Sequence, residues 1–385
     1  RRVMLNRTIT VGQILLMLTL LSAGDVVAQR RGGNRGQGAA RRPTARTATA
    51  RGPSLPAPFH TLPAAQTIQV SRVGQLSVAW LAGNAPQLDD VDPVVDLFGP
   101  FGGRRATTEE GEELPENEWG LVVLSGLEGK QRRVLYNLAI KQQNEHAQYV
   151  ALRKRLLAKL SPLRGTTKVD RTFDREVQEL GGQLGQLEAS LAFEQAVTFA
   201  DLGRTLTDSQ KAFLARLRAD PRLFDPQADN VVTMREGVAK VDANLQLPLL
   251  DLAAKAGSFL TGTAVNNPKS VPKRLDLLGE TNRREGDFVV SFLKSVNAMQ
   301  YEEYGDLVRG ETSLLASISA KRLQMLGLLD QQKRTQSTND AKLKALAKSS
   351  GETEARLALL RVRSFEQLRR SLTEDQKVIL RQAAG

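Results

Sequence analysis

The chain contains no cysteine among its 385 residues. This absence excludes disulfide bonds, thiolate metal sites, iron–sulfur clusters and cysteine nucleophiles. Histidine is almost as scarce, because His60 lies in a proline-rich segment and His146 in a stretch rich in Gln, Asn and Glu, and a zinc site is therefore not expected. The chain also lacks a Walker loop, a dinucleotide fingerprint and a Gly-x-Ser-x-Gly elbow. We expect a protein that is not an enzyme and that needs no cofactor or metal.

Acidic residues are nearly absent from the stretch 1–60, which holds ten Arg, no Lys and one acid, Asp25. The stretch 61–385 holds 44 basic and 41 acidic side chains, so the net charge of +12 belongs mainly to the N-terminal part. Because the body is nearly neutral, it lacks the electrostatic footprint of a nucleic-acid-binding protein. No nucleic-acid partner is expected.

Residues 1–28 are typical of an export signal. Basic residues precede an apolar run over 11–21, and Val26-Val27-Ala28 provides a cleavage site. The run is about half as long as the ~20 residues that a membrane-spanning helix needs. We therefore expect cleavage near Ala28 and a periplasmic or secreted protein, by either the general or the twin-arginine route.

Residues 29–60 are rich in Arg, Gly and Pro and have almost no apolar content, which predicts a disordered linker that could contact an envelope surface. Residues 61–116 show no clear period and are interpreted as an irregular segment, in which 67–73 could be a strand and 76–81 a strand or a helix. Residues 218–280 carry five prolines and are interpreted as a connector with short helical pieces.

The rest of the chain has helical periodicity, in two units at 117–217 and 281–385. In the first unit, apolar side chains at 173, 177, 180, 184, 187 and 191 form a heptad-like seam. Gly181, Gly182 and Gly185 lie within that seam and predict a close helix–helix approach or a local kink. In the second unit we expect helix breaks near Gly351 and at Ser371.

A phrase of the first unit recurs in the second. Residues 188–211 and 354–377 share 11 of 24 positions, including Leu-Thr-x-x-Gln in both copies. This repetition predicts an all-α fold of two related helical-hairpin units with long amphipathic helices. We also match Gln143-Asn-Glu145 with Gln300-Tyr-Glu302, in a slightly different register.

The Leu-Thr-x-x-Gln motif has a local physical role. The Thr hydroxyl can accept a hydrogen bond from the backbone three residues later, and the Gln side chain can reach back to the Thr amide, which is a capping box. Each box should contribute on the order of 1 kcal/mol to stability. The motif residues, whose expected role is structural, are Leu206, Thr207, Gln210, Leu372, Thr373 and Gln376.

Two such motifs in a helical, cysteine-free chain behind an export signal resemble the Spy/CpxP family of periplasmic proteins. The resemblance covers roughly 130–217 and 288–382. It implies a curved helical cradle that holds unfolded proteins without ATP, and it implies that two units in one chain could form the pair that relatives form as homodimers. The low content of Met and His argues against a metal-binding branch. The candidate client-binding cations are Arg153, Lys154, Arg155, Arg361, Arg363, Arg369 and Arg370.

Two other functions stay open from the sequence. The chain could be a structural or assembly protein of the cell envelope that oligomerises through the heptad-like seam by coiled-coil packing. A weaker alternative is an enzyme with its site in 61–116. For the cations, an ordinary solvated helix face is the competing interpretation.

Overall fold

In the computed structural model we describe residues 64–83, 116–165, 171–219, 225, 227–262 and 286–384. These residues form helices and the turns next to them, with no strand among them, which confirms the predicted all-α class. None of the helices in these ranges is long and apolar enough to cross a membrane. The leader and linker predicted at 1–28 and 29–60 lie outside the described residues.

Two sets of helices follow the same order of short, long, long and short. The first set is α3 (Glu116–Ser125), α4 (Gly129–Leu160, continued by the 3-10 turn Ser161–Leu163), α5 (Arg171–Thr205) and α6 (Asp208–Ala219). The second is α10 (Gly286–Lys294), α11 (Ala298–Thr335), α12 (Asp340–Arg370) and α13 (Glu374–Ala384). The described ranges also hold α2 (Ala64–Ala82), α7 (Asp229–Ala239) and α8 (Ala243–Thr261).

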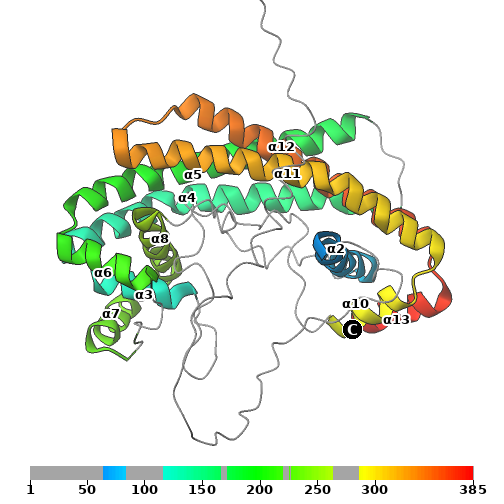
Figure 1. The fold of residues 1–385 in the computed structure, drawn as a ribbon, viewed down its shortest axis with the longest axis horizontal. Helices are drawn as coiled ribbons and strands as arrows, with labels where there is room; N and C mark the ends of the chain where they lie inside the picture. Colours follow the sequence, from blue (N-terminus) through cyan, green and yellow to red (C-terminus); the bar gives the residue numbers. More distant parts are fainter. Residues whose placement is uncertain are drawn as a thin grey trace, which may run out of the picture.

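The four long helices lie side by side and form the span of an arch (Figure 1). At one end α3, α6, α7 and α8 turn away from the span, and at the other end α2, α10 and α13 turn to the same side (Figure 1). Each hairpin of long helices therefore has its short helices at one end of the arch and its tip toward the other.

The span is held together where α5 crosses α12 without room for side chains. A Cβ at Gly181 would overlap the backbone of Gly351, and a Cβ at Gly185 would overlap the backbone of Ala347. The expected close helix approach is confirmed. The two contacts are related by the repeat, since Gly185 and Gly351 are equivalent positions, as are Gly181 and Ala347.

Two apolar cores lie at the two ends of the arch. One core joins α3, α6 and α8 to the tip of the second hairpin through Met325, Leu329 and Leu343. The other joins α2, α10 and α13 to the tip of the first hairpin through Leu160 and Leu163. Each hairpin tip thus packs against the short helices of the other set.

The structure corrects three expectations about helix boundaries. Residues 64–82 form one helix, so the interpretations as an irregular segment and of 67–73 as a strand are wrong, whereas the helical alternative for 76–81 is confirmed. The stretch lacks an amphipathic period because it is buried along most of its described length. Within 218–280, α8 is a buried core helix rather than a piece of a connector. Gly351 does not break α12; it lets the backbone of α12 approach that of α5 closely. The predicted break at Ser371 is present.

The heptad-like seam of α5 is covered within the chain. Val177, Leu180, Leu184 and Leu191 are buried in the core that also holds Ala355, Ala358 and Val362 of α12. The seam is therefore not available to a second molecule, which removes the structural basis for oligomerisation through it.

Candidate functional site

The first Leu-Thr-x-x-Gln motif forms the capping box that its sequence predicts. The backbone N–H of Gln210 donates to the Thr207 hydroxyl at 3.2 Å, and the backbone N–H of Thr207 donates to Oε1 of the Gln210 side chain at 2.9 Å. Leu206 is buried beneath the turn. The box starts α6 directly after α5 and fixes the angle between them.

A second box, at the start of α4, interlocks with the first. Glu128 donates its N–H to Oε1 of Gln131 at 2.7 Å, and Gln131 and Gln210 exchange reciprocal amide hydrogen bonds of 3.1 and 2.8 Å. Gln210 also donates to the carbonyl of Gly126, and Gln131 to that of Thr205. Two glutamines therefore join the turn before α4 to the turn before α6.

The second motif repeats this arrangement. Thr373 and Gln376 form the box before α13, with bonds of 3.0 and 3.3 Å. Gln300, in the box started by Asn297, exchanges bonds of 3.0 and 2.8 Å with Gln376. Gln376 is completely buried, and Leu372 packs partly buried against the core.

The structure corrects the match of Gln143 with Gln300 between the first long helices. Gln300 has its counterpart in Gln131, whose amide makes the equivalent bonds, whereas Gln143 is exposed. Gln131 and Gln300 were not predicted as partners of the motif. The signal was present, because each lies three positions after an N-cap residue, Glu128 or Asn297, in the spacing of a capping box.

A buried ionic cluster lies in the middle of the span. Arg322 of α11 contacts Glu188 of α5 at 2.7 Å and Glu354 of α12 at 3.2 Å. Burial raises the pKa of Glu354 to about 7. The charge of Glu188 also raises this pKa, whereas the charge of Arg322 lowers it. Burial also raises the pKa of Tyr149 above its usual value. Glu188 and Glu354 are equivalent positions of the repeat.

A second buried ion pair has a neutral counterpart in the other hairpin. Nε of Arg361 contacts Oε1 of Glu311 at 2.5 Å, and both side chains are almost fully buried, at 3% and 0% exposure. At the equivalent positions in the first hairpin, Gln195 donates to Gln142 at 3.0 Å. One position of the fold is therefore filled by a salt bridge in one half and by an amide pair in the other.

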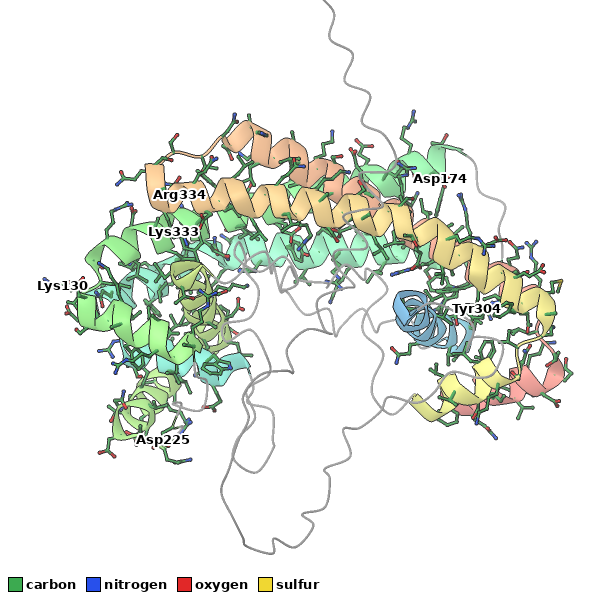
Figure 2. The ribbon with its side chains drawn as sticks, viewed as in Figure 1. Lys130, Asp174, Asp225, Tyr304, Lys333 and Arg334 are labelled. Carbon is green, nitrogen blue, oxygen red and sulfur yellow. The ribbon has the colours of Figure 1, made fainter. Side chains whose placement is uncertain are left out.

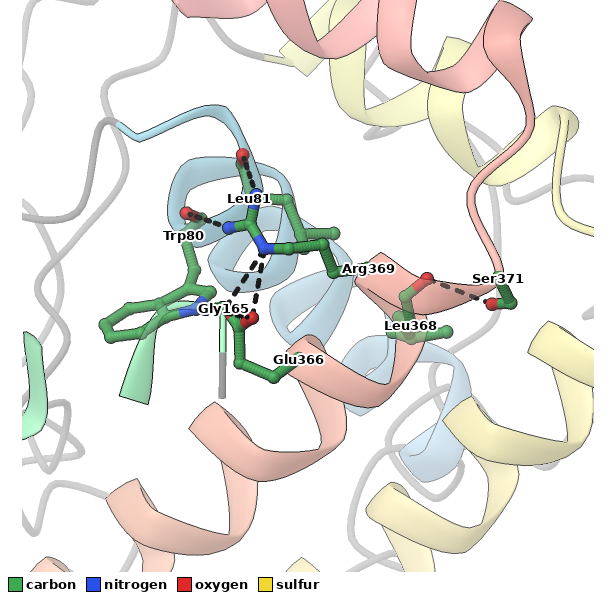
Figure 3. A network of polar contacts seen from close by, with 7 residues as sticks. All are labelled: Trp80, Leu81, Gly165, Glu366, Leu368, Arg369 and Ser371. Carbon is green, nitrogen blue, oxygen red and sulfur yellow. Dashed lines mark hydrogen bonds and ion pairs between the residues drawn. The ribbon is translucent and has the colours of Figure 1, made fainter. Parts of the chain in front are cut away.

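A polar network anchors α2 to the second set of helices (Figure 3). Nε1 of Trp80 donates to Glu366 at 2.7 Å, and the backbone N–H of Gly165 donates to the other Glu366 oxygen at 2.7 Å. Gly165 has φ of +83°, a conformation that favours glycine. Arg369 contacts Glu366 at 3.1 Å and donates to the carbonyls of Trp80 and Leu81.

The candidate client-binding cations do not form one surface. Arg361 is buried with Glu311, so its placement on a surface is wrong, because its partner on α11 could not be inferred from the period of α12. Arg369 donates to a backbone carbonyl of α2, and Arg363 contacts Asp174 at 2.5 Å. The others lie on two helices: Arg153 and Lys154 half-buried and Arg155 exposed on α4, and Arg370 exposed at the end of α12.

The described residues contain no group of His, Asp and Glu that could hold a metal ion. His146 is half-buried on α4, and His60 lies outside the described residues. A scan against protein-family models and searches of curated proteins and of solved structures found no match to this chain.

Proposed function

We propose that the protein is an ATP-independent binding protein that holds unfolded or partly folded polypeptides on a curved helical body, in the manner of the Spy/CpxP family. The observation that carries the proposal is the antiparallel pairing of two motif-bearing hairpins in one arch (Figure 1). In this proposal the chain forms internally the pair that the resemblance implies for two copies. An exported location and contact of the basic linker with an envelope surface belong to the same proposal.

The role of the motif in this proposal is mechanical. The interlocked pairs Gln131–Gln210 and Gln300–Gln376 fix the short helices at the two ends of the arch at a defined angle to the span. Buried amide pairs with all bonds made favour a single geometry. The motifs are thus proposed to set the curvature of the body and not to contact clients.

The surface that we propose for clients is the broad exposed face of α4, with Val134 near one edge and Ile140 near the other. Val134 and Ile140 are 39% and 44% exposed. Helical spacing places Arg133 on the side of Ile140 and Lys141 on the side of Val134. Such a mixture of cations and apolar side chains attracts unfolded chains by charge and holds them by small apolar contacts.

The test is aggregation of an unfolding client, followed by light scattering without ATP. We expect suppression at near-stoichiometric ratios, and a weaker effect for Val134→Ser with Ile140→Ser. The matched control is Val378→Ser, which removes a side chain of similar exposure, 42%, from α13. Unchanged aggregation at every ratio refutes the holding function, and equal activity of the α4 and α13 variants refutes the proposed surface.

A further inference from the structure

Helix α2 packs on a site formed by all four helices of the second set, α10, α11, α12 and α13. Its buried apolar side chains include Val70, Val73, Leu76 and Leu81. In Figure 1 α2 lies between α10 and the span, at the end of the arch opposite to α3. The helix that comes first in the described chain therefore completes the core of the helices that come last.

The site recognises α2 through specific polar contacts as well as apolar area. The hydroxyl groups of Ser77 and Tyr304 are 2.5 Å apart, and Tyr304 projects toward α2 (Figure 2). Glu366 accepts from the Trp80 indole, Arg369 donates to the last carbonyls of α2, and the Arg164 guanidinium lies 4.8 Å from the Trp80 ring centre. These groups select a helix with an indole in its last turn.

Helix α8 is the counterpart of α2 at the other end of the arch. Nζ of Lys333 lies 4.8 Å from the ring centre of Phe259. Lys333 and Arg164 are equivalent positions, in the same register that relates Gln131 to Gln300. Each end of the arch therefore accepts an apolar helix whose last turn carries an aromatic ring beneath a cation.

The two inserted helices differ in how the chain holds them. Only the short turn 240–242 separates α8 from α7, and α7 itself packs on α3. After α2, which ends at Ala82, the next helix of the described chain begins at Glu116. Fully extended, a chain of this number of residues spans roughly 100 Å, so its length alone does not tie α2 to one position.

The charged groups that contact α2 are also paired with each other. Glu366 and Arg369 are three positions apart on α12 and contact one another at 3.1 Å, so they remain paired when Trp80 departs. The side chains of Tyr304 and Ser77 carry neutral hydroxyl groups, whose hydrogen bonds water can replace. The polar part of the interface is therefore built from groups that can be hydrated when it opens.

We propose that α10–α13 form a helix-binding site that α2 occupies reversibly, and that the site accepts a helical segment of another polypeptide with an apolar face and a tryptophan in its last turn. In the closed molecule α2 blocks this site. This binding site is separate from the client surface proposed on α4. Its occupancy can be measured without an aggregating client.

Hydrogen exchange of the full chain tests whether α2 opens by itself. We expect the amides of 70–82 to exchange at least tenfold faster than those of 245–259 in α8, through an opening that leaves the rest of the molecule protected. Equal protection of the two helices would overturn reversible occupancy.

Peptide binding tests the site directly. A fluorescent peptide of residues 64–83 is titrated against the full chain with Leu76→Asp, which disables the internal α2, and against the wild-type chain. We expect saturable binding to the variant, at least tenfold weaker binding to wild type because the internal helix competes, and at least tenfold weaker binding of the Trp80→Ala peptide. The absence of saturable binding to a folded variant, or equal binding of both peptides, overturns the site. If the variant does not fold, the hydrogen-exchange result on the wild-type chain decides.

Discussion

The buried pair of Arg361 and Glu311 gives the sharpest test of how the span is stabilised. Arg361→Gln removes the cation and leaves the Glu311 carboxylate, which is 0% exposed, without its charged partner. Breaking a buried pair in this way costs about 3–5 kcal/mol of unfolding free energy. A substitution of one side chain should therefore remove a large part of the stability of a domain.

The chain itself supplies the compensating substitution. Gln142 and Gln195 occupy the equivalent positions in the first hairpin and are joined by a hydrogen bond of 3.0 Å. The double variant Glu311→Gln with Arg361→Gln copies that pair into the second hairpin. Because a neutral hydrogen-bonded pair carries no uncompensated charge, we expect the double variant to lie within about 1–2 kcal/mol of wild type.

The assay is equilibrium urea unfolding followed by circular dichroism, with all variants compared at one pH. Arg363→Gln is the matched control, because its ion pair with Asp174 is partly exposed and should contribute less than about 1 kcal/mol. The reasoning is refuted if the double variant is as unstable as Arg361→Gln alone. It is also refuted if Arg361→Gln costs no more than the control.

Three further predictions concern the span and the motifs. Burial raises the pKa of Glu354 to about 7, above its unfolded value, so its stabilising contribution is complete below the unfolded value and is lost as the pH rises through 7. Relative to Glu354→Gln, wild type should lose unfolding free energy between pH 5 and pH 8 in urea titrations, and a flat difference between the two proteins would contradict this. Gly351→Ala places a methyl group against the backbone of α5 and should lower the melting temperature by several degrees, whereas Gly327→Ala, with nothing within 4 Å, should leave it unchanged or raise it. Gln376→Ala leaves the buried polar partners of Gln376 without their hydrogen bonds and should lower the unfolding free energy by about 2–3 kcal/mol. The exposed Lys377→Ala should lower it by less than about 0.5 kcal/mol, and equal losses would contradict a stabilising role of the Gln300–Gln376 pair.

The parts of the fold that depend on local sequence were predictable. The capping boxes at Thr207 and Thr373 join positions three apart, so the sequence contains both partners of each bond. The all-α class followed from periodicity over long segments. The glycines of α5 also predicted a close approach, since a helix interior rarely retains several glycines without a packing reason.

The parts that depend on distant partners were not predictable from the sequence. Arg361 has the spacing of a solvated face, but its partner Glu311 lies on another helix, far away along the chain. The stretch from Leu76 to Trp80 alternates apolar and small residues, so the sequence left a strand and a helix both open; it is a helix buried by α10 to α13, which lie far away along the chain. Gln131 and Gln300 carried a local signal, and the reason for their pairing with Gln210 and Gln376 is tertiary.

The position of α2 has a consequence for how the molecule is made. Helix α2 ends at Ala82, and its binding site is complete only after α13, which begins at Glu374. At synthesis rates of about 5–20 residues per second, α2 waits roughly 15–60 s before its own partner exists. A nascent chain in this interval presents an apolar helix with nothing of its own to cover it. Synthesis of α13 is therefore the event that completes the site for α2.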